Sequence, residues 1–98
     1  MAVMEIVVIP MGTGKPGVSE FVAGCVKVLD EMGLKYQLTA MGTIVEGSLD
    51  QLCEAAKRMH RVPFEMGAPR VVTSIRIDER ADRELHIEEK VKAVEEKL

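Results

Sequence analysis

The polar residues that could do chemistry gather in one apolar stretch, residues 36–47. Thr39, Thr43 and Glu46 fall within eight positions there, among apolar neighbours. Glu46 is also expected on the same sheet face as Glu5, and two carboxylates on one face can form a general acid–base pair. The sequence has no Ser/His/Asp set, no Cys beside a His and no cluster of metal ligands. We therefore expect no enzyme and no metal, and two alternatives stay open: a small-molecule site, or an oligomeric structural or regulatory module.

A glycine-rich loop at residues 11–17 matches the G-x-G-x-x-G pattern of dinucleotide-binding folds through Gly12, Gly14 and Gly17. Pro16 removes an amide that a pyrophosphate would use. The next predicted strand does not end in the acidic residue that binds a ribose, and the chain is too short for a doubly wound sheet. We therefore expect a loop that binds no nucleotide.

Three further side chains with reactive or ligating chemistry have structural explanations. Cys25 and Cys53 each fall on the apolar side of a predicted helix, and two thiols so far apart do not make a metal motif. We expect both thiols to be reduced and buried, with a disulfide between the two helices as the alternative. His60 lies near the end of a predicted helix, where capping or surface exposure is expected.

Length and composition predict one domain, residues 1–98, with an aliphatic core. Apolar residues make up 47% of the chain, whereas only one Tyr, two Phe and no Trp are present. The net charge of −3 is spread without a basic stripe, so we expect no nucleic-acid partner. No apolar run has the length of a membrane span, and no basic segment precedes the apolar N-terminus. We expect a soluble, cytoplasmic protein with no membrane partner.

Hydrophobic periodicity predicts the order strand, helix, strand, strand, helix, strand, followed by a short helix. Ser19 could cap the first main helix, Gly33 could end it, and Ser48 with Gln51 reads as a capping box for the second. The strands are expected at residues 2–10, 35–40, 43–46 and 70–78, a loop at 62–69, and the last helix from 87 to 98. This order predicts an α+β, ferredoxin-like βαββαβ sandwich with an extra C-terminal helix. Right-handed crossovers then give an antiparallel sheet of order 4-1-3-2, with both main helices on one face.

The other face of the sheet is expected to be open and partly apolar. Alternation assigns Met4, Ile6 and Val8 to the helix-covered side, together with Thr43 and Val45. The open face then carries Glu5, Val7, Ile9, Gln37, Thr39, Ile44, Glu46, Val72, Ser74 and Arg76. A monomer should not leave this apolar surface in water. We therefore predict that the open face packs on a second copy, in a homodimer or homotetramer.

Several segments together resemble the small thiamine-binding protein family, the YkoF-like proteins with a ferredoxin-like fold. The similarity extends over nearly the whole chain, and its most specific part runs from Leu38-Thr39 through Met41-Gly42-Thr43 to Glu46-Gly47. Ala40 departs from the family pattern, where a proline is common. The matching segments are residues 5–13, 18–22, 36–47, 70–80 and 90–95.

This resemblance implies a non-catalytic protein that binds thiamine or its hydroxymethylpyrimidine part as a ligand, needs no cofactor, and holds the ligand at a subunit interface. The ligand-site positions carried over from the family are Thr39, Met41, Gly42, Thr43 and Glu46, with Pro10 and Met11 as neighbours.

Within that set, Glu46 is suited to accept from both the amine and the protonated ring nitrogen of an aminopyrimidine. We expect Thr39 to lie across from it on the neighbouring strand. The alternative is that Glu46 pairs with Arg76 or with an arginine of another subunit.

Overall fold

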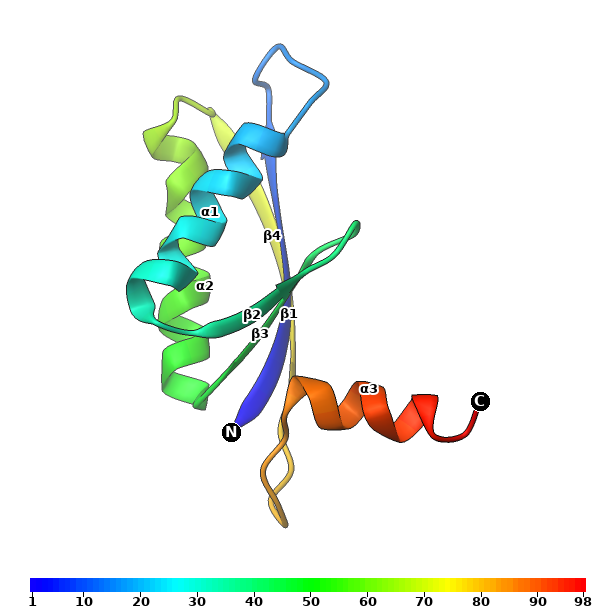
Figure 1. Ribbon diagram of the computed structural model, residues 1–98. Coiled ribbons are helices and arrows are strands. Elements are labelled where there is room, and N and C mark those ends of the chain that lie inside the picture. Colours follow the sequence, from blue (N-terminus) through cyan, green and yellow to red (C-terminus); the bar gives the residue numbers. More distant parts are fainter.

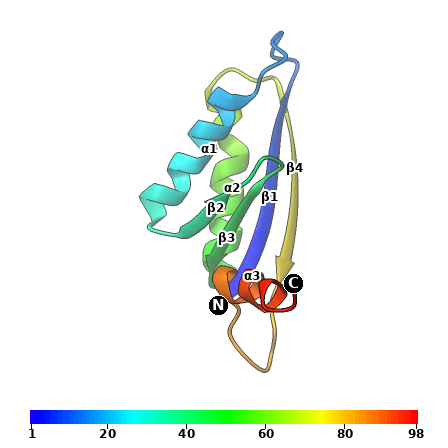
Figure 2. The ribbon, with the colours of Figure 1, turned by 45° about the vertical axis from the view of Figure 1, so that its right-hand side comes forward.

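The computed structural model describes all residues, 1–98, and has the predicted α+β architecture. The elements are β1 (Ala2–Met11), α1 (Ser19–Met32), β2 (Lys35–Leu38), β3 (Thr43–Gly47), α2 (Leu49–Glu65), β4 (Arg70–Asp78) and α3 (Ile87–Glu95). The four strands form an antiparallel sheet of order β2-β3-β1-β4, which is 4-1-3-2 read from the other edge. Helices α1 and α2 cover one face of this sheet, and α3 lies on the opposite side at one end (Figures 1 and 2).

The main core lies between the sheet and the two long helices, and the predicted alternation of the central strand is confirmed. Met4 and Ile6 of β1 are almost completely buried, with 0% and 2% of their surface exposed, and Val8 packs against the same cluster. Val45 of β3 and Leu29 of α1 complete its centre. The aliphatic core thus follows from side chains that alternate along the strands.

The beginnings and ends of the helices agree with the predictions in part. Gly33 ends α1 in a left-handed conformation, with φ of 66°, and Ser48 and Gln51 form the predicted capping box. The prediction that Ser19 caps α1 is wrong. Ser19 is the first helical residue, the N-cap is Val18 without a side-chain hydrogen bond, and the Val18 carbonyl oxygen accepts from the amides of residues 21 and 22.

The predicted loop at residues 62–69 is also wrong in part, because α2 continues through Pro63 to Glu65. Proline has no N–H to donate to the carbonyl four residues earlier, which belongs to Met59. The buried thiol of Cys25 takes that place, with its Sγ 3.4 Å from the Met59 carbonyl oxygen. Burial of Pro63 and this thiol contact together offset the missing backbone hydrogen bond.

The prediction of two buried cysteines is correct for one of them. Cys25 is buried, Cys53 is exposed, and both are free thiols. The buried stripe of α2 contains Leu52, Ala55, Ala56, Met59 and Pro63. Position 53 points about 100° away from position 52 on a helix, so its side chain falls outside this stripe.

The shape of the molecule is extended by α3, which projects from the lower end of the open face (Figure 1). The radius of gyration is 14.4 Å, larger than the roughly 13 Å typical of a compact domain of this length. Val91 and Val94 on α3 are exposed, as are Ile9 and Val72 on the sheet. None of the three helices is long and apolar enough to cross a membrane.

Candidate functional site

A groove of about 600 Å³ lies on the open face, between the strands and α3. We call it the open-face groove. It is lined by Val3, Glu5, Gln37, Ile44, Arg76, Ile77, Asp78, Ile87, Lys90 and Val91. All four strands and the first turns of α3 thus contribute to it.

The floor of this groove is a single row of side chains across all four strands. Gln37 of β2 is opposite Ile44 of β3, which is opposite Glu5 of β1, which is opposite Arg76 of β4. Because side chains on paired positions project to the same face, this row presents an amide, an apolar group, a carboxylate and a guanidinium in order. Neighbouring strands are about 4.8 Å apart, so the row spans roughly 14 Å.

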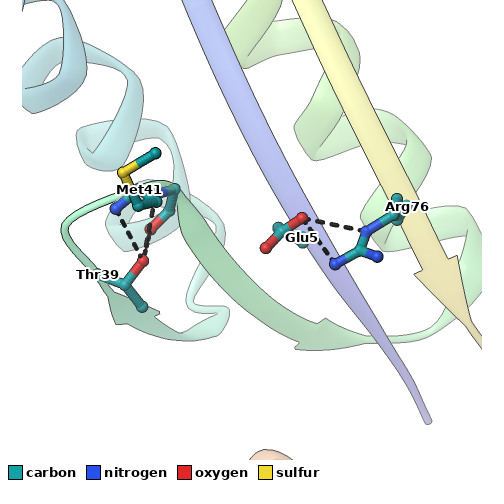
Figure 3. Close-up of polar contacts among 5 residues, drawn as sticks. Glu5, Thr39, Met41 and Arg76 are labelled. Carbon is teal, nitrogen blue, oxygen red and sulfur yellow. Dashed lines mark hydrogen bonds and ion pairs between the residues drawn. The ribbon is translucent and has the colours of Figure 1, made fainter.

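Glu5 and Arg76 form an ion pair that leaves part of the carboxylate available. The Nε and Nη2 atoms of Arg76 each lie 3.1 Å from the same oxygen, Oε1 of Glu5 (Figure 3). The other oxygen, Oε2, has no hydrogen-bond partner in the structure. An oriented carboxylate with one free oxygen beside an apolar side chain can accept a hydrogen bond from a planar nitrogen heterocycle.

Three of the predicted site residues, Thr39, Met41 and Gly42, form the turn between β2 and β3, and Thr43 is the first residue of β3. The hydroxyl of Thr39 donates to the Gly42 carbonyl oxygen at 2.7 Å and accepts from the amides of Met41 and Gly42 at 3.3 and 3.1 Å (Figure 3). Met41 is exposed at the tip, whereas Thr43 is buried. The polar capacity of Thr39 is therefore used within the turn itself.

Glu46 lies elsewhere, at the other end of β3. Its partners across the sheet are Lys35 and Val3, so the expectation that Thr39 lies across from it is wrong. The cause is the tight turn at residues 39–42, which pairs Leu38 with Thr43, so that three positions further from the turn on each strand Lys35 lies opposite Glu46. Glu46 is only 7% exposed, and its Oε1 accepts from the amide of Ile87 at 2.9 Å.

Pro10 and Met11 lie at the far end of β1, opposite Val71 and Arg70 of β4. Seven strand positions separate Pro10 from Val3, which pairs with Glu46, and this corresponds to about 23 Å. The seven predicted site residues therefore form three separate groups: the β2–β3 turn, Glu46, and the end of β1. The structure does not bring them together around one small cavity.

The residues of the groove floor were placed on the open face by alternation but were not assigned to a site. Alternation gives the face of each side chain, whereas the strand register decides which side chains meet. The register here depends on the turn at residues 39–42 and on pairing between β1 and β4, which are far apart in sequence. A carboxylate and an arginine predicted on the same face of neighbouring strands were the available signal.

Contacts between charged groups around α3 shift the pKa values of two of them. A hydrogen bond from Lys35 lowers the pKa of the Glu88 carboxyl, and the same contact raises the pKa of the Lys35 ammonium. Lys90 is paired with Asp78 at 2.6 Å. No three His, Cys, Asp or Glu side chains come together as a metal site.

Comparisons with known proteins agree with this fold and with the resemblance of the sequence. A family model described as thiamine-binding protein matches residues 4–95. The UPF0045 protein YqgV of Bacillus subtilis is 41% identical over 102 residues, which span 100% of this chain and 98% of that protein.

Two crystal structures share the fold over nearly their whole length. A hypothetical protein of Methanocaldococcus jannaschii has a TM-score of 0.89 and 41% identity, with 97% of this chain and 96% of that chain covered. A protein of Thermotoga maritima, named for a proposed role in thiamine biosynthesis or salvage, has a TM-score of 0.79 and 27% identity, with 95% and 97% covered. With a family match over most of its length and relatives of this similarity, the chain belongs to the thiamine-binding protein family.

Proposed function

We propose that this protein binds thiamine, or its hydroxymethylpyrimidine part, in the open-face groove and catalyses no reaction on it. The observation that carries the proposal is the row of Gln37, Ile44, Glu5 and Arg76 on the groove floor. Family membership supports the class of ligand. The order of polar and apolar side chains along the row supports the open-face groove as the place where the ligand binds.

The chemistry of an aminopyrimidine matches this row. Its exocyclic amine, or its protonated ring nitrogen, donates to the free Oε2 of Glu5, and charge makes this hydrogen bond strong. The amide of Gln37 can donate to or accept from the remaining polar edge of the ring. Ile44 and the side chains of α3 then supply apolar contact to the faces of the ring.

We further propose that a second copy of the chain covers the open face, in a homodimer or homotetramer. The part of the face above the groove carries Ile9 and Val72, which are 44% and 39% exposed. Exposed apolar surface of this kind on a small domain favours association. A second copy would close the groove, which is open to solvent along one side in the monomer.

Calorimetric titration with thiamine and with hydroxymethylpyrimidine tests the proposal. Glu5→Gln keeps the shape of the side chain but weakens a charged hydrogen bond, and we expect about tenfold to hundredfold lower affinity. Ser74→Ala, on the same face but outside the groove, is the control and should bind normally. Light scattering at the same concentration checks that the assembly is unchanged.

The titration also decides between Glu5 and the sequence-based prediction of Glu46 as the anchor. Glu46→Gln with normal folding and more than tenfold weaker binding than Glu5→Gln would assign the anchor to Glu46. If the wild-type protein binds neither compound, the alternative function, an oligomeric structural or regulatory module, is favoured.

A further inference from the structure

We propose that Glu46 is a positioning residue that fixes α3 in place as one wall of the open-face groove. The consequence for ligand binding rests on the function proposed above, whereas the attachment of α3 to the sheet does not. Glu46 would thus act on a ligand through the helix rather than by touching it.

The first step of the argument is that α3 has no cap of its own. Its N-cap residue is His86, whose side chain makes no capping hydrogen bond. The amide of Ile87 instead donates to Oε1 of Glu46 at 2.9 Å, and Nδ1 of His86 lies 3.3 Å from the same oxygen. A carboxylate at a helix N-terminus is also stabilised by the helix dipole. The cap therefore comes from a strand residue 41 positions earlier in the chain.

The second step is that Glu46 is built into the structure as a buried group. It is one of two buried polar or charged residues in the chain, and its side chain is only 8% exposed. A buried carboxylate is costly unless it is hydrogen-bonded. The Ile87 amide supplies that bond, so one contact gives the buried carboxylate a hydrogen-bond donor and gives the first turn of α3 an acceptor.

The third step is that little else holds α3. Val3, Leu85 and Ile87 form a small apolar cluster apart from the main core, with Ile44 against it. The amide of Leu85 also donates to the carbonyl of Met1 at 3.2 Å. The remaining links are exposed ion pairs, and pairs of that kind contribute little to stability.

The fourth step connects this attachment to the groove. Ile87, Lys90 and Val91 line the groove, and all three lie in the first turns of α3, next to the contact with Glu46. Farther along, Val94 is 61% exposed and gives the helix no second anchor. Local opening of α3 would therefore remove the wall while leaving the sheet and the two long helices intact.

Hydrogen exchange of the ligand-free protein tests the attachment directly. Glu46→Ala removes the acceptor, and we expect the amides of residues 87–91 to exchange about tenfold faster or more, with the sheet amides unchanged. Glu46→Gln keeps a neutral acceptor and should give an intermediate rate. Glu89→Ala is the control, because it removes an exposed first-turn carboxylate that has no hydrogen-bond partner, and it should quicken the exchange of the α3 amides far less than Glu46→Ala.

The same variants are then titrated with thiamine and hydroxymethylpyrimidine. Glu46→Ala should lose affinity together with protection of α3, and Glu46→Gln should recover part of both. Glu5→Gln should lose affinity with α3 fully protected, which separates a group that touches the ligand from one that positions a wall.

Three results would overturn the proposal. Wild-type exchange rates in α3 of Glu46→Ala would show that Glu46 does not hold the helix. Faster exchange in α3 with unchanged affinity would show that the helix is not a wall of the site. If Glu46→Ala does not fold, Glu46→Gln with wild-type exchange in α3 would count against the attachment. If wild type binds neither compound, the proposed function fails, and the exchange rates still decide the attachment.

Discussion

Replacing Thr39 by valine should destabilise the protein without affecting the ligand site in the groove. Valine has nearly the same shape as threonine, and it removes only the hydroxyl that donates to the Gly42 carbonyl and accepts from two turn amides. The structure thus assigns Thr39 to the turn that sets the register of β2 against β3. This differs from the prediction of a ligand contact made from the sequence.

The size of the effect follows from the geometry of these contacts. One is short, at 2.7 Å, and the other two are 3.1 and 3.3 Å. A net hydrogen bond contributes about 0.5–1.5 kcal/mol, and exposed groups lie near the lower limit because water replaces the partner. We expect a loss of about 1 kcal/mol in the free energy of unfolding. For a domain of this size, that corresponds to a Tm lower by roughly 4–8 °C.

Thermal unfolding and calorimetry at a fixed protein concentration measure both quantities, because assembly would make Tm depend on concentration. Thr39→Ser keeps the hydroxyl and is the matched control, with a Tm near that of wild type. An unchanged Tm in Thr39→Val would refute the structural role of the hydroxyl. An unchanged Tm together with weaker thiamine binding would instead support the sequence-based prediction that Thr39 contacts the ligand.

Three further predictions follow from burial and charge. A thiol reagent should label Cys53 rapidly in the native protein and Cys25 only after unfolding, because burial raises the pKa of the Cys25 thiol to about 11; equal rates measured by mass spectrometry would contradict this. Leu29→Ala should lower the free energy of unfolding, measured in urea, by about 2–5 kcal/mol, since Leu29 is completely buried in the core; a decrease below about 1 kcal/mol would contradict this prediction. The lowered pKa of Glu88 and the raised pKa of Lys35 mean that their pair stabilises α3 above the unfolded-state pKa of Glu88 and below that of Lys35. The protection factors of the α3 amides, which correct for the intrinsic pH dependence of exchange, should therefore fall slightly as the pH drops through the folded pKa of Glu88 or rises through that of Lys35, and a Glu88→Gln variant should lose most of this dependence.

The elements, their order and the faces of their side chains were predictable because they depend on local patterns. Alternation in β1 and the helical spacing of the two long helices are visible within single segments. Sheet order followed from the handedness of the crossovers. The misplaced Cys53 shows the limit of this reasoning, because one helical position turns a side chain by about 100°.

The candidate site was less predictable because it depends on contacts between distant segments. The tight turn at residues 39–42 pairs Leu38 with Thr43, and this register makes Lys35, rather than Thr39, the partner of Glu46. The hydrogen bond from Ile87 to Glu46 joins β3 to α3, and no local pattern shows where α3 packs.

The central position of β1 has a consequence for how the chain folds during synthesis. β1 is made first, yet one of its two neighbours is β4, and the pairing joins Val3 to Asp78. The β1–α1–β2–β3 part can assemble once residue 47 has emerged, and β1 then presents an unpaired edge until β4 follows. Contacts between such distant residues slow folding, and exposed strand edges promote association of nascent chains. The last strand to be synthesised is thus the one that closes this edge of the central strand.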